Sequence, residues 1–160
     1  MNRNAKILII GCGVAGPAAA LFLERAGFEP VIYEAMPESD DYTGLFLNVG
    51  RNGMRILREL GVDEDVRQAG MEMRIMRFHS GNGKLLGQIG HLTGEPQGYT
   101  IKRGQLHRIL RSKAEQQGIP IVFGKRLADI RMSNTQVTAL FSDGTSATGD
   151  VLIGCDGIQS

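Results

Sequence analysis

The fold is decided close to the N-terminus, where positions 7–16 read ILIIGCGVAG. The apolar residues of 6–10 predict a short strand that is buried on both faces of a parallel sheet. The stretch 15–26 is small or apolar nearly all round until its last turn, which predicts a helix packed on that sheet. A second apolar run follows at 31–33. The first part of the chain, about 30 residues, therefore predicts a strand–helix–strand crossover between parallel strands.

The turn between this strand and this helix has the pattern G-x-G-x-x-G, formed by Gly11, Gly13 and Gly16. Gly11 permits the tight turn, Gly13 lets the backbone approach a diphosphate, and Gly16 lets the helix lie close to the sheet. Val14 and Ala15 open the helix, where free N–H groups and the helix dipole favour an anion by about 0.3–1 kcal/mol. The turn itself carries no basic side chain. It predicts a site for the diphosphate of a dinucleotide, and the alternative is a glycine-rich turn that binds nothing.

Glu34 ends the second strand, eighteen residues after Gly16. A carboxylate at this position can accept hydrogen bonds from both hydroxyls of an adenosine ribose. A 2′-phosphate would meet its negative charge, at a cost of about 4 kcal/mol for charges roughly 4 Å apart at an effective dielectric of about 20. We therefore expect FAD or NAD in the turn, and not NADP. The alternative for Glu34 is an exposed acid at the end of a strand.

The rest of the chain predicts short elements around a single domain, with a loop at 35–50 and no linker. The expected helices are 52–60 and 105–116, and the expected strands are 73–78, 84–89, 99–102, 119–123, 127–132, 136–141 and 151–154. The dipeptides Asn82-Gly83 and Asp143-Gly144 predict hairpin turns. Together these patterns predict an α/β protein with a parallel sheet and an inserted antiparallel meander at about 127–147.

Composition excludes several classes of protein. The 18 basic and 17 acidic residues leave a net charge of +1, which gives no electrostatic footprint for nucleic acid. No run approaches the ~20 apolar residues of a membrane span. Cys12 and Cys155 suit a reducing compartment, the cytoplasm, and buried packing better than redox catalysis. His79, His91 and His107 lack neighbours at metal-ligand spacing, so we expect no metal site, and we expect His107 on the surface of its helix.

The glycine turn, Glu34 and Asp156-Gly157 together resemble the FAD-dependent aromatic hydroxylases, which are flavoprotein monooxygenases of the para-hydroxybenzoate hydroxylase type. The resemblance runs from 7 to 160 in the family's order. It implies that Asp156 and Gly157 lie beside the flavin and help to bind FAD and the pyridine nucleotide. It also implies that 44–48 is the family's loop beside the flavin.

Three further positions enter through the same resemblance. Arg103 begins an Arg-x-x-Leu-x-x-x-Leu pattern, which implies a contact with the FAD phosphates or ribitol. Leu127 stands where the family usually has an apolar residue near the adenine. Ala35 follows Glu34 where many relatives have arginine, and we expect it at the same cofactor site. The sequence assigns no catalytic residue.

The resemblance implies a Rossmann-like FAD-binding domain over residues 1–160, in an enzyme that uses FAD, NAD(P)H and O₂ to hydroxylate an aromatic or similar small molecule. Relatives continue into a substrate-covering sheet and a later Gly-Asp segment. We therefore expect this chain to be incomplete for turnover, and to self-associate through surface that the missing half would cover. Two alternatives stay open: another FAD-dependent oxidoreductase, or a non-catalytic module that binds NAD or FAD.

Overall fold

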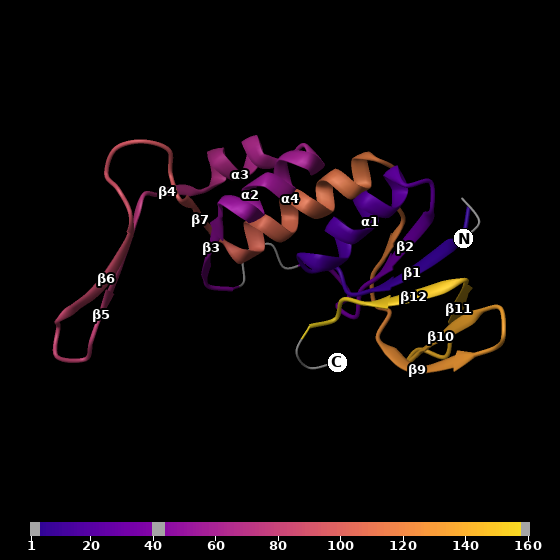
Figure 1. Ribbon diagram of the computed structural model, residues 1–160. Coiled ribbons are helices and arrows are strands. Elements are labelled where there is room, and N and C mark those ends of the chain that lie inside the picture. The colour runs from indigo at the N-terminus through magenta and orange to yellow at the C-terminus, as the bar shows by residue number, and fades with distance from the viewer. Residues whose placement is uncertain (1–3, 40–43, 158–160) are drawn as a thin grey trace. The chain divides into compact units, whose positions relative to one another are not determined.

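A computed structural model describes residues 4–39 and 44–157 (Figure 1). The chain forms two compact units. The first unit comprises residues 1–41 and 107–160, and the second comprises residues 42–106 between them. Helix α4 (Arg103–Gln116) crosses the boundary, with its first turn in the second unit and the remainder in the first.

The described residues of the first unit form a four-stranded parallel sheet in the order β12-β1-β2-β8. Its strands are β1 (Lys6–Ile10), β2 (Glu29–Tyr33), β8 (Ile121–Val122) and β12 (Val151–Gly154). Leu8 and Ile9 of β1 are fully buried, as a central strand covered on both faces requires. Helix α1 (Ala15–Arg25) connects β1 to β2 and buries Ala20 and Leu21. These elements confirm the predicted crossover.

The order of the strands marks the edge of the sheet where a ligand would bind. Strand β2 lies on one side of β1, and β12 lies on the other, so the direction of winding reverses at β1. In open α/β sheets, ligands bind outside the carboxyl ends of the strands at such a switch point. The glycine turn starts at the carboxyl end of β1 and therefore begins at this edge.

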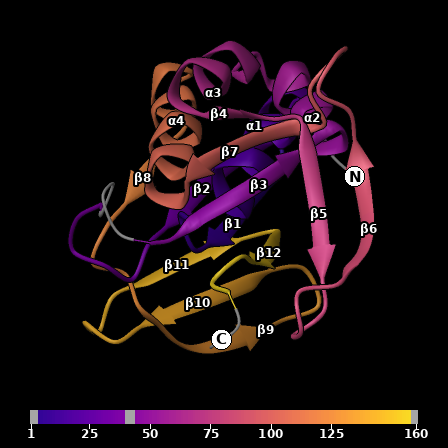
Figure 2. The same ribbon diagram turned by 90° about the vertical axis from the view of Figure 1, so that its left-hand side faces the viewer.

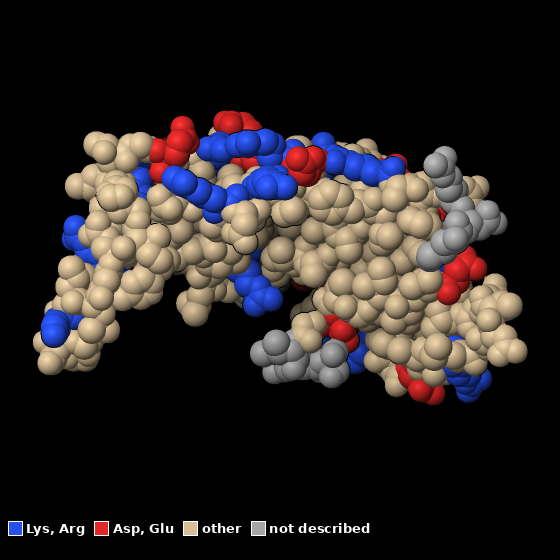
Figure 3. Space-filling view, in the orientation of Figure 1, with Lys and Arg blue, Asp and Glu red and all other residues tan. Residues whose placement is uncertain are grey.

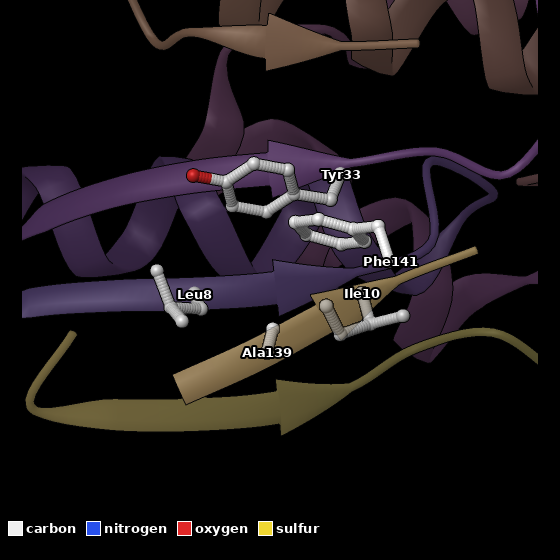
Figure 4. Close-up of a cluster of buried hydrophobic side chains, with 5 residues drawn as sticks. All are labelled: Leu8, Ile10, Tyr33, Ala139 and Phe141. Atoms are coloured by element: carbon white, nitrogen blue, oxygen red, sulfur yellow. The ribbon is translucent and has the colours of Figure 1, made fainter. Parts of the chain in front are cut away.

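An antiparallel sheet packs against the parallel one inside the first unit. Its strands are β9 (Leu127–Met132), β10 (Val137–Phe141) and β11 (Ser146–Gly149), in the order β11-β10-β9. A buried cluster joins the two sheets through Leu8, Ile10, Tyr33, Ala139 and Phe141 (Figure 4). The rings of Tyr33 and Phe141 have centroids 4.9 Å apart. The predicted meander is confirmed, and its burial against Tyr33 anchors the chain directly before Glu34.

The second unit has a separate antiparallel sheet in the order β3-β7-β4. Its strands are β3 (Phe46–Gly50), β7 (Gly98–Lys102) and β4 (Met71–Met73), and its helices are α2 (Arg51–Leu60) and α3 (Asp63–Ala69). The helices bury Leu57, Leu60 and Val66. Strands β5 (Ile75–His79) and β6 (Leu85–Gly90) pair with each other as the predicted hairpin, visible as a two-stranded ribbon in Figure 2.

Three elements of the second unit differ from the prediction. The expected strand 73–78 is divided, because β4 pairs with β7 whereas β5 pairs with β6. Residues 46–50, expected within a loop, form β3 because they pair with β7, a strand far along the chain that local pattern does not reveal. Helix α3 was not expected. Its signal is the acidic first turn of Asp63, Glu64 and Asp65, since negative charge stabilises a helix N-terminus.

Candidate functional site

The glycine turn is held against the end of β12 by contacts that only glycine allows. Gly11 has a φ of 105°, and its N–H donates to the carbonyl oxygen of Tyr33 at 2.7 Å. A Cβ on Gly11 would lie 2.4 Å from the carbonyl oxygen of Cys155 and 2.9 Å from Cα of Asp156. The Cys155 N–H in turn donates to the Ile10 carbonyl oxygen at 2.6 Å. The carboxyl ends of β1 and β12 therefore meet directly at the turn.

The other two glycines of the motif have different surroundings. A Cβ on Gly16 would lie 2.0 Å from the carbonyl oxygen of Gly11, so this glycine lets α1 lie tight on the turn. A Cβ on Gly13 would meet only the Cε1 atom of His107, at 3.9 Å, among the described residues. The space over Gly13 is therefore open, as a close approach by a ligand requires. Gly11 and Gly16 are thus in the tight turn and the close helix packing that the motif predicts, and the diphosphate contact at Gly13 stays a prediction.

The N-terminus of α1 carries no capping side chain of its own. Val14 is the N-cap residue and makes no side-chain capping hydrogen bond, and the first turn, which starts at Ala15, contains no acidic residue. The first N–H groups of a helix have no partner within the helix, and they carry the positive end of its dipole. The turn and the first residues of α1 thus provide donors that suit an anion.

Glu34 lies at the mouth of this turn. Its Oε2 accepts the Cys12 N–H at 2.7 Å, and its Oε1 accepts the Met36 N–H at 2.9 Å. Its backbone is fixed on the side of β8, because its N–H donates to the Val122 oxygen at 2.9 Å and its carbonyl accepts the Lys125 N–H at 2.7 Å. The carboxylate is therefore held in place before any ligand arrives. Each of its oxygens retains lone-pair capacity for a hydroxyl donor.

The two cysteines flank the turn and are unsuited to thiolate chemistry. Burial raises the pKa of the Cys12 thiol to about 12, with a further contribution from the negative charge of Glu34. Burial also raises the pKa of the partly buried Cys155. Both groups are protonated near neutral pH, and nucleophilic chemistry requires the thiolate. Their position supports the packing role expected from the sequence.

The remaining predicted residues of the first unit lie around the same edge. Asp156 is exposed and follows β12, with its Cα beside Gly11, and Gly157 has a φ of 91°. Ala35 lies between Glu34 and the exposed Met36. Leu127 begins β9 and packs, partly buried, against the cluster that contains Tyr33. The structure therefore brings the glycine turn, Glu34, Ala35, Leu127 and Asp156 into one unit.

Arg103 belongs to the second unit, where it begins α4. Its side chain lies against Gly44, because a Cβ on that glycine would be 3.2 Å from Cβ of Arg103. Its backbone N–H donates to the Leu45 carbonyl oxygen at 3.1 Å. The stretch that the resemblance placed beside the flavin is thus packed on Arg103. A contact of Arg103 with a cofactor stays a prediction.

Sequence reasoning missed two basic residues of α4 that lie near the turn. His107, expected on the surface, is half-buried, and its ring borders the space over Gly13. The guanidinium of Arg111 pairs with Glu115 at 3.7 Å, and its charge acts on the thiol of Cys12. The signal was the helical spacing of four between His107 and Arg111, which places both on one side of α4. Only the tertiary packing shows that this side meets the turn.

Other kinds of site find little support in the described ranges 4–39 and 44–157. Within them, no three His, Cys, Asp or Glu residues are grouped so that they could hold a metal ion. No helix in those ranges has the length and apolar character needed to cross a membrane. Uncharged atoms cover most of the face drawn in Figure 3, and both acidic and basic side chains appear on it, in keeping with the net charge of +1.

Comparison with known proteins also indicates an FAD site. The sequence model of a family described as "FAD binding domain" matches residues 4–160. A flavin-dependent monooxygenase of Legionella longbeachae is 34% identical over 166 residues, which cover 100% of this chain and 41% of that protein. The 6-hydroxynicotinate 3-monooxygenase of Pseudomonas fluorescens is 31% identical over 169 residues, covering 100% and 42% respectively.

A solved structure agrees with these sequence matches. The Klebsiella pneumoniae protein HpxO, crystallised with FAD and uric acid, superposes with a TM-score of 0.73 at 27% identity, covering 92% of this chain and 38% of that one. The chain therefore spans about two fifths of the length of the relatives it matches. Because the family match extends over residues 4–160, this protein belongs to the FAD binding domain family, among relatives that are flavin-dependent monooxygenases.

Proposed function

We propose that this chain is the FAD-binding part of a flavin-dependent monooxygenase that uses NAD(P)H and O₂ to hydroxylate an aromatic or similar small molecule. One observation carries the proposal. The Glu34 carboxylate lies 2.7 Å from the Cys12 N–H, so the acceptor for a ribose and the donors for a diphosphate meet at the switch point of the sheet. An adenine dinucleotide needs both groups side by side.

The residues present fit FAD by three features of the structure. The space over Gly13 is open, the N-terminus of α1 has no side-chain cap, and Glu34 is held by backbone donors on both of its oxygens. We assign the diphosphate to the amides around Gly13 and the adenosine ribose to Glu34. A 2′-phosphate would be repelled by Glu34, which favours FAD over a phosphorylated dinucleotide.

The remaining assignments of the proposal follow the family resemblance. Gly11, Gly16, Val14 and Ala15 shape and open the turn, Ala35 and Leu127 border the adenosine end, and Arg103 and Asp156-Gly157 contact the flavin half. FAD, when bound, supplies the electron transfer from NAD(P)H and the activation of O₂. The chain's own residues position the cofactor, and the substrate class is taken from relatives that act on 6-hydroxynicotinate or bind uric acid.

A titration with four ligands tests the proposal. FAD, FMN, NAD and NADP are each added to the purified chain, and binding is followed by flavin fluorescence or by calorimetry. The proposal predicts one FAD per chain, weaker FMN binding because FMN lacks the adenosine half, and no displacement of bound FAD by NADP. A chain that binds NAD but no flavin would instead be a dehydrogenase or a non-catalytic module, and the monooxygenase assignment would be wrong.

A further inference from the structure

Helix α4 brings one ionisable side chain to the open space over the glycine turn. Among the described residues, Cε1 of His107 is the heavy atom that a Cβ on Gly13 would approach, at 3.9 Å. The ring is half-buried, and the helix is fixed by the buried residues Leu106 and Leu110 on its inner face. His107 therefore borders the space that Gly13 leaves open.

The side chain of His107 can bring a hydrogen-bond donor to the space over Gly13. Apart from the two chain neighbours of Gly13, Cε1 of His107 is the one described atom within 4 Å of a Cβ built on that glycine. An imidazole ring carries one N–H donor when neutral and two when protonated. A hydrogen bond from such a ring to a phosphate oxygen is charge-assisted, and such bonds are about twice as strong as neutral ones.

We propose that His107 donates a hydrogen bond to the diphosphate of the dinucleotide held at the glycine turn. This inference rests on the proposed function, since it names a further binding residue of the same site. It gives the turn a side-chain donor from a distant part of the sequence, in addition to the backbone donors of residues 13–16.

The test distinguishes the contribution of the diphosphate to affinity from that of the rest of the ligand. Affinities for FAD, ADP and adenosine are measured by calorimetry on the wild-type chain and on the variants His107→Phe and His107→Gln. Phenylalanine keeps a ring without a donor, and glutamine restores an N–H donor. His91→Ala, at an exposed loop residue of the second unit, is the matched control. Thermal unfolding without ligand checks that each variant is folded.

We expect His107→Phe to weaken FAD and ADP by roughly tenfold each and to leave adenosine unchanged, with partial recovery in His107→Gln and no effect in the control. In NMR spectra of the wild-type chain, the Cε1–H signal of His107 should move when ADP is added, and the signals of His79 and His91 should stay. This second measurement does not depend on the folding of a variant.

Three results would overturn the inference, and they differ from one another. If the wild type binds neither FAD nor ADP, the proposed function fails and the role of His107 fails with it. If the wild type binds both and His107→Phe binds them equally well, only the role of His107 is wrong. If the variant weakens adenosine as much as ADP, His107 supports the shape of the turn and does not contact the diphosphate.

Discussion

Substitution of Gly13 by alanine separates ligand binding from folding at this site. The added methyl group would have its nearest described neighbour 3.9 Å away, so the stability of the unliganded chain should change by less than about 0.5 kcal/mol. The same methyl group would fill the space that a diphosphate needs. Loss of one hydrogen bond to a charged group costs about 1.5–3 kcal/mol, which corresponds to a rise in the Kd for FAD of roughly 10- to 150-fold.

Gly16→Ala provides the opposite case. Its Cβ would lie 2.0 Å from the Gly11 carbonyl oxygen, so α1 must move away from the turn. We expect a loss of about 1–3 kcal/mol of stability, although alanine is by itself the better helix former by about 1 kcal/mol. Gly81→Ala, where a Cβ would meet no atom within 4 Å, is the matched control.

The assay for these variants combines two measurements. Urea unfolding without ligand gives the stability of each variant, and quenching of flavin fluorescence gives its Kd for FAD. The reasoning predicts that Gly13→Ala loses affinity without loss of stability and that Gly16→Ala loses stability. It would be refuted if Gly13→Ala bound FAD as the wild type does, or if it unfolded as easily as Gly16→Ala.

Three further predictions concern other features of the chain. Glu34→Gln should weaken FAD by about tenfold in calorimetry and lower the Tm, because its amide nitrogen must face one of two backbone N–H donors; unchanged affinity would contradict the role of Glu34. Because the folded pKa of Cys12 is about 12 against 9.0 for a free thiol, its contribution to stability is present below pH 9 and is lost as the pH rises toward 12. Urea melts of Cys12→Ala should show a shallower loss over this range, and an equal slope would contradict the burial argument. Leu86 and Ile89 of the hairpin are 66% and 54% exposed, so the wild type should self-associate in sedimentation and the double variant Leu86→Lys, Ile89→Lys should not; a monomeric wild type would contradict this.

The first crossover could be predicted from the sequence because its information is local. An apolar run, a glycine motif and a second apolar run ending in Glu34 each depend on neighbouring residues, and the structure has them as predicted. The hairpin around Asn82-Gly83 and the antiparallel meander are local in the same sense. The glycine motif also fixes its own geometry, because Gly11 and Gly16 are in contact with atoms that exclude any Cβ.

The features that were missed depend on contacts between distant segments. Strand β3 exists because 46–50 pairs with 98–102, and its own sequence does not alternate clearly. The place of His107 beside Gly13 depends on how α4 packs within the first unit, which no local pattern encodes. Helix α3 is the exception, since its acidic first turn was a local signal that could have been used.

The central claim is that the glycine turn holds a diphosphate while Glu34 holds the adjoining ribose. Backbone amide NMR on the labelled 17.4 kDa chain tests this most directly, because each N–H reports on its own surroundings. On addition of FAD, the account predicts the largest shifts at the amides of 12–16 and at Met36. The Met36 N–H donates to the Glu34 carboxylate, which would also bind the ribose. If the signals of these amides did not change and the largest shifts occurred in another part of the chain, the account would be contradicted.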